Sequence, residues 1–179
     1  MTLRRKLILG TSVVLISLAA VPLYRDFQRS RMAANATAAA GVCRKYCEAQ
    51  EIFHRSDHNG DNVLEYAQSL RELDAEHLLP EGVSSAELDA GAPSPYHGYV
   101  FRVLKRQGGK LGMPKDYIKD GHMTQGYGLV AFRADYGTSG IPTAVISNSG
   151  TIYMKDLGVA VTVGRKTVEF DPSEYGNWG

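Results

Sequence analysis

The sequence predicts an α+β fold in which one long N-terminal helix packs on a C-terminal antiparallel β-sheet. Residues 24–53 are rich in alanine, the strongest helix former, and their apolar side chains recur every three or four positions. After Pro95 the chain changes to short runs of β-branched and aromatic residues separated by glycines. Because an amphipathic helix must bury its apolar stripe, we expect the helix to pack on this sheet.

The N-terminal segment is apolar and follows a basic cap, Arg4 to Lys6. The run from Leu7 to Leu23 has 17 residues and no charge, which is at the short end of what crosses a bilayer. The charges favour a cytoplasmic N-terminus. Ser17-Leu18-Ala19 has the small-x-small form that signal peptidase prefers, so cleavage is the competing interpretation. Residues 1–23 are therefore predicted to be a membrane anchor or a signal segment, and residues 24–179 a single exported domain.

The first part of this domain, residues 24–78, is predicted to be helical. The long helix is expected to continue to Phe53, and a short helix is expected from about Leu64 to Leu78. Residues 80–95 contain several prolines and glycines and are predicted to form a loop. One face of the long helix should pack on the sheet, and its members are Ala39, Val42, Tyr46, Ala49 and Phe53.

The second part, residues 96–171, is predicted to form the sheet. Asn148-Ser149-Gly150 ends in a glycine between two strand-like runs, which predicts a hairpin. The predicted strands are Tyr99–Leu104, Tyr127–Arg133, Thr143–Ser147 and Thr151–Met154, followed by an apolar stretch at Val159–Val163. Aromatic side chains on these runs either form the core or line a ligand surface, and alternation on strands favours the core. These aromatics are Tyr96, Tyr99, Phe101, Tyr127, Phe132 and Tyr153.

Composition and motifs give no indication of catalysis. Lysine and arginine total 20 against 19 for aspartate and glutamate, so the charge balance predicts no nucleic-acid partner. The sequence contains no Gly-x-Ser-x-Gly, no P-loop and no dinucleotide glycine fingerprint. We therefore expect a protein that is not an enzyme.

The two cysteines, Cys43 and Cys47, are one helical turn apart. They are too few for a disulfide framework. Three interpretations stay open: small apolar packing residues, a strained or intermolecular disulfide, or part of a metal site. A zinc or haem site with His54 would lack a local Cys-x-x-Cys or His-x-x-x-His pair.

The segment after the long helix contains the best metal-binding candidate. Oxygen-bearing side chains at alternate positions, with a backbone carbonyl at the fourth, are typical of an EF-hand-like calcium loop. Asn62 stands where the EF-hand has glycine, and Gln68 stands where it has a bidentate glutamate. We therefore expect weak Ca²⁺ binding, and the competing interpretation is a polar turn with Asp57 or Asn59 as an N-cap. The predicted ligands are Asp57, Asn59, Asp61, Val63 and Glu65.

The stretch SLAAVPLYRDFQRSRMAANATAAAGVCRKYCEAQEIFH resembles the N-terminal helix of type IV pilins and type II secretion pseudopilins. The shared features are an apolar segment that ends Ala-Ala-Val-Pro, a tyrosine two residues later, and an alanine-rich amphipathic helix. In that family the apolar half lies in the inner membrane or in a filament core, and the other half packs on an antiparallel sheet. The chain departs from the family's processing site, because the apolar run contains no glutamate and Gly10 is followed by Thr11-Ser12-Val13.

A second set of motifs is similar to an uncharacterised family of exported bacterial proteins. Its parts are D-x-N-G-D-x-V-L-E-Y-A from Asp57, H-G-Y-x-F-x-V-L from His97, GLVAFRADYG from Gly128 and Y-M-K-D-L-G from Tyr153. This resemblance implies export and carries no known activity.

Together these patterns lead to the hypothesis of a non-catalytic, membrane-anchored envelope protein, a pseudopilin-like component of a secretion or pilus assembly. It would be a single-pass protein of the bacterial inner membrane, held through residues 7–23, with a periplasmic C-terminal domain. Its expected partners are other envelope or secretion proteins, with self-association left open. The alternative is a soluble periplasmic or secreted binding module, released by signal-peptide cleavage, that binds calcium.

Overall fold

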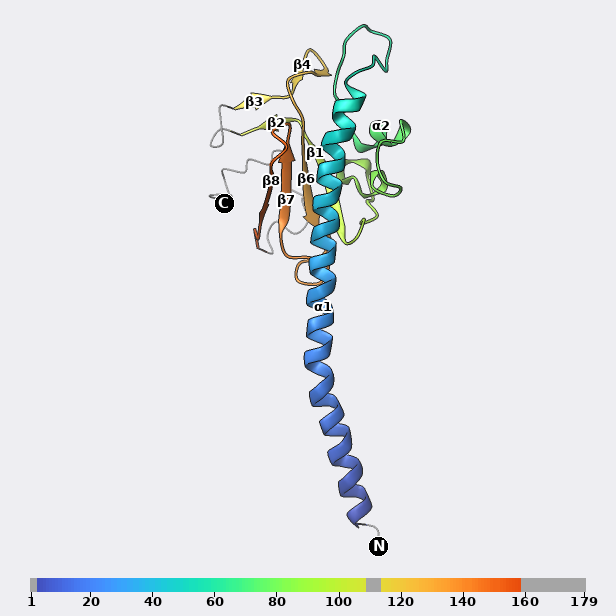
Figure 1. Cartoon of the computed structure of the whole chain (residues 1–179), viewed down its shortest axis with the longest axis vertical. Helices are drawn as coiled ribbons and strands as arrows, with labels where there is room; N and C mark the ends of the chain where they lie inside the picture. The colour runs from blue at the N-terminus through green and yellow to red at the C-terminus, as the bar shows by residue number, and fades with distance from the viewer. Residues whose placement is uncertain (1–2, 109–113, 159–179) are drawn as a thin grey trace.

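The computed structural model describes residues 3–108 and 114–158, with side chains described from residue 21 onward. The chain folds as a long helix followed by a four-stranded antiparallel sheet, so the α+β prediction is confirmed (Figure 1). The helices are α1 (Leu3–Phe53) and α2 (Leu70–Ala75), with 3₁₀ turns η1 (Ser84–Ala86) and η2 (Leu88–Ala90). The strands are β1 (Tyr99–Leu104), β2 (Arg106–Gln107), β3 (Lys115–Asp116), β4 (Ile118–Lys119), β5 (His122–Met123), β6 (Gly128–Arg133), β7 (Thr143–Ser147) and β8 (Ile152–Lys155).

Helix α1 has 51 residues, includes Pro22 and ends at Phe53, as predicted. Its C-terminal part packs on β6, β7 and β8, and its N-terminal part extends away from the domain (Figure 1). All five side chains predicted to face the sheet are buried. Among the residues that the structure describes, no helix is both long enough and apolar enough to cross a membrane.

The main sheet has the strand order β1-β6-β7-β8, and all neighbours are antiparallel. Register is set by pairs such as Leu104 with Gly128 and Ile146 with Ile152. The β7–β8 pairing confirms the hairpin predicted at residues 148–150, where Gly150 has a φ of 74°. Four of the six aromatics in question, Tyr99, Phe101, Tyr127 and Phe132, are at most 2% exposed, so they belong to the core.

The helix expected from Leu64 to Leu78 is shorter than predicted, because only Leu70–Ala75 is helical. Residues 66 and 67 are not helical, and their backbone N–H groups are bound to Met123 and Gln50 respectively. The short strands β2 to β5 were not predicted, and the predicted loop at 80–95 contains two 3₁₀ turns. The predicted stretch Val159–Val163 lies outside the described residues.

Candidate functional site

The segment between α1 and α2 is held to the domain by hydrogen bonds to its own backbone groups. The side chain of Gln50 on α1 accepts the N–H of Ala67 at 2.8 Å and donates to its carbonyl at 2.9 Å. One residue earlier, the N–H of Tyr66 donates to the carbonyl of Met123 on β5 at 2.8 Å. These bonds fix the end of the loop against both the helix and the β4–β5 hairpin.

Asp57 organises the turn itself. Its carboxylate accepts the backbone N–H groups of Asn59, Gly60 and Asn62 at 3.2, 2.8 and 2.8 Å. These bonds, led by that from Asn62, hold the pKa of Asp57 below its ordinary value because they stabilise the charged form. Asn62 has a φ of 67°, which asparagine tolerates better than most residues. Asp57 therefore stabilises the loop backbone.

Neither Asp57 nor Asn59 is the N-cap of the following helix, so this part of the polar-turn interpretation is wrong. The cap of α2 is Ser69, whose hydroxyl accepts the N–H of Glu72 at 3.3 Å. Glu72 in turn accepts the Ser69 hydroxyl at 2.9 Å. Ser69-Leu70-Arg71-Glu72 matches the S-x-x-E capping pattern, which is the sequence signal that could have located the helix start.

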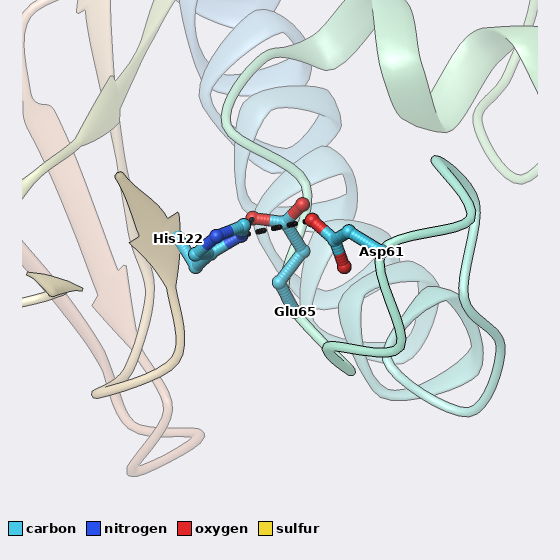
Figure 2. A group of neighbouring side chains, drawn as sticks. All are labelled: Asp61, Glu65 and His122. Carbon is cyan, nitrogen blue, oxygen red and sulfur yellow. Dashed lines mark ion pairs between the residues drawn. The ribbon is translucent and has the colours of Figure 1, made fainter. Parts of the chain in front are cut away.

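Two of the predicted metal ligands, Asp61 and Glu65, lie together with His122, which comes from β5 (Figure 2). The Nδ1 atom of His122 is 3.5 Å from Asp61 Oδ2 and 3.4 Å from Glu65 Oε2. One ligand atom from each of the three residues lies within 4.8 Å of the others. Within the described part of the chain, no other group of three such side chains is this close.

The remaining predicted ligands have different positions. The Asn59 amide donates to Asp61 Oδ2 at 2.8 Å and to Glu65 Oε1 at 3.1 Å, so it connects the two carboxylates. The backbone N–H of Val63 donates to Asp61 Oδ1 at 2.8 Å. Calcium binding by the whole predicted set stays a prediction. His122 was missed because it is an isolated histidine 57 residues after Glu65, with no local motif around it.

The cysteines form no metal site with His54 among the described residues. Both are free thiols, and Cys43 is fully buried in the core between α1 and the sheet. Cys47 is partly buried, with its Sγ 3.7 Å from the carbonyl oxygen of Ser147. His54 instead stacks on Tyr66, with ring centroids 4.2 Å apart. Of the three interpretations, packing residues describe Cys43 best.

Comparison with known proteins places the chain in a family. A family model described as "Protein of unknown function (DUF2950)" matches residues 72–178, which is more than half of the chain. The chain belongs to this family, and the expectation of an uncharacterised family is confirmed. No curated protein and no solved structure matches. The matched region includes His122 and every strand, whereas α1, Asp61 and Glu65 precede it.

Proposed function

We propose that this member of the DUF2950 family is a non-catalytic, membrane-anchored envelope protein whose domain is held on the C-terminal part of a long helix. One observation carries the proposal. The apolar side chains of Val21, Leu23, Tyr24 and Phe27 on α1 are between 51% and 71% exposed. They directly continue the uncharged run that starts at Leu7. Side chains of this kind favour an apolar surrounding, which lipid or a partner helix would supply.

The arrangement of α1 supports an anchor at a distance from the domain. Among the described residues, the side-chain hydrogen bonds from α1 to the domain begin at Arg31 and Asn35, which donate to the carbonyls of Thr138 and Ser139. If residues 7–23 lie in the membrane, the seven helical residues 24–30 separate it from Arg31, and they extend for roughly 10 Å. The exposed part of the helix would therefore be a short spacer between the bilayer and the domain (Figure 1). The side chains of residues 3–20 are not described, so this part of the support comes from the sequence.

Within this function, the pilin-like role is the more specific proposal. It is supported by the order of elements, with a long helix whose second half packs on an antiparallel sheet. The protein would act through protein contacts in a secretion or pilus-like assembly. Pull-down of the full chain from crosslinked membranes should then enrich secretion or pilus components. If neither secretion nor pilus components were enriched, the result would count against the assembly role. It would not bear on the membrane anchor, which has its own test.

Membrane extraction tests the anchor directly. We expect the full chain to stay in the membrane pellet after a carbonate wash. Leu15→Arg places a charge in the apolar run, which costs about 3 kcal/mol at the centre of a membrane helix, and should release much of the protein. Thr37→Arg is the matched control, because it places the same charge on the same helix outside the run.

The mature N-terminus separates the anchor from the alternative. Mass spectrometry of the pelleted protein should find the N-terminal residues still attached. A chain that starts at Ala20 or Val21 and washes off the membrane would overturn the anchor. It would favour the soluble periplasmic binding module instead.

A further inference from the structure

We propose that Asp61, Glu65 and His122 bind a divalent transition-metal ion, with zinc as the first candidate, and that this ion ties the loop after α1 to the β4–β5 hairpin. The three side chains come from two segments that are far apart in the sequence and meet at one point (Figure 2). Two carboxylates and one imidazole are a ligand set that suits zinc and other divalent first-row transition metals. The carboxylates would also balance the two charges of the ion.

The separations between the ligand atoms fit such an ion. Zinc binds imidazole nitrogen and carboxylate oxygen at about 2.0–2.2 Å, so tetrahedral neighbours lie about 3.3–3.5 Å apart. The Nδ1 atom of His122 is 3.5 Å from Asp61 Oδ2 and 3.4 Å from Glu65 Oε2. Three protein ligands would leave one position for water. The exposed fractions of the side chains, from 18% to 35%, allow an ion to enter from solvent.

The environment of the His122 Nδ1 atom is a second reason to expect a ligand here. Its Nδ1 atom is buried and makes no hydrogen bond, although it lies within ion-pairing distance of both carboxylates. A protonated imidazole that paired with these carboxylates would normally approach to about 2.7–2.9 Å. At 3.4 and 3.5 Å the imidazole is too far from either carboxylate for a good hydrogen bond, and the space between the three groups suits a bound cation.

Hydrogen bonds from neighbouring residues already hold the candidate ligands in place without a metal. Glu65 Oε2 accepts the N–H of Met123 at 3.3 Å, next to His122 in β5. Gln68 donates to the carbonyl of Gly121 at 2.7 Å, on the other side of His122. The Asn59 amide bonds to both carboxylates. Hydrogen bonds of this kind orient the metal ligands and are a usual feature of protein metal sites.

The geometry favours a transition metal over calcium. Calcium takes six to eight oxygen ligands and rarely uses nitrogen. At the meeting point of the three residues, one ligand is an imidazole, and both oxygens of Asp57 are already bonded to backbone N–H groups. This site therefore differs from the calcium loop predicted for residues 57–65, which does not include His122.

Calorimetric titration of the detergent-solubilised full chain tests the proposal. After treatment with EDTA, the protein should bind one Zn²⁺ per chain with saturable heat, and its melting temperature should rise by several degrees. Cobalt should give the visible d–d spectrum of a low-coordinate site. His122→Asn should weaken zinc binding at least about tenfold, the lower end of what loss of a single supporting group costs.

The control is His77→Asn, which changes an exposed histidine outside the group; its φ of 57° is one that asparagine tolerates. It should bind zinc like the unchanged protein. A thermal melt in EDTA shows whether His122→Asn has lost its fold. If it has, Glu65→Gln is a second variant that removes one ligand. Equal zinc affinity in folded His122→Asn, or no zinc heat at millimolar concentration, would overturn the proposal. The proposal would also be overturned if calcium bound more tightly than zinc and His122→Asn left the calcium affinity unchanged.

Discussion

The two parts of helix α1 that have described side chains differ in how they are buried. In residues 39–53 the five apolar side chains predicted to face the sheet, from Ala39 to Phe53, are at most 5% exposed. In residues 21–27 the four large apolar side chains are at least 51% exposed. Both segments lie on one uninterrupted helix. Helix formation therefore does not decide burial, which depends on whether a complementary surface lies alongside.

The composition of the two stripes explains the difference. At about 100° per residue, the packed side chains cover an arc of roughly 120°, and the exposed ones cover about 160° on an overlapping side of the helix. The packed stripe contains small residues such as Ala39, Cys43 and Ala49, which let the helix axis approach the sheet. The exposed stripe consists of larger side chains. It is suited to a surface that adapts to it, such as lipid or the groove of another helix.

The largest contrast is expected from removing one aromatic side chain in each part. Tyr46 is fully buried, and its hydroxyl donates to the carbonyl of Gly128 at 3.2 Å. Tyr46→Ala should lower the free energy of unfolding by about 3–5 kcal/mol through the cavity and the lost bond. Phe27→Ala, at 62% exposure, should change it by less than about 0.5 kcal/mol. Urea unfolding followed by circular dichroism measures both, and similar losses would contradict the comparison.

A smaller contrast is expected between two neighbouring polar residues of the packed part. Gln50 is fully buried and bonds to both backbone groups of Ala67 and to the Tyr46 hydroxyl. Gln50→Ala would leave buried backbone groups without partners and should cost about 2–3 kcal/mol. Glu48 is exposed and pairs only with Lys45, at 3.2 Å, so Glu48→Ala should cost less than about 0.5 kcal/mol. Urea unfolding measures both losses. If Gln50→Ala left the free energy of unfolding unchanged, water would have replaced these bonds.

Local periodicity was enough to predict most of the architecture. The face of α1, the main strands and the β7–β8 hairpin each depend on residues close together in the sequence. The extent of α2 was mispredicted because residues 66 and 67 bond to Gln50 and Met123, which are distant in the chain. Such long-range pairing overrides the helical pattern that begins at Leu64. The Ser69–Glu72 capping pair was the local evidence for the true helix start.

The candidate site was only partly predictable for the same reason. Asp61 and Glu65 stood out because they belong to a spaced acidic motif. His122 had no such pattern, and it reaches the carboxylates only through the β4–β5 hairpin, whose strands have two residues each. Arg133 is comparable, because a charged residue that is fully buried at the end of β6 is not expected from composition. Its guanidinium donates to the Thr143 hydroxyl at 2.8 Å.

Thiol reactivity compares the packed part of α1 with an exposed position outside it, and it disturbs the fold least. Desolvation by burial raises the pKa of Cys43 to about 12, so at pH 8 almost none of it is the reactive thiolate. In a Cys47→Ala background, Cys43 should therefore react with iodoacetamide at least about 100-fold more slowly than a free peptide thiol. A cysteine introduced by Ala33→Cys, with both native cysteines changed to alanine, should react like a free thiol because position 33 is exposed. Mass spectrometry over time gives both rates, and in denaturant the two should become equal. Fast labelling of Cys43 without denaturant would mean that α1 separates from the sheet, and the packed part would then resemble the exposed part in solution.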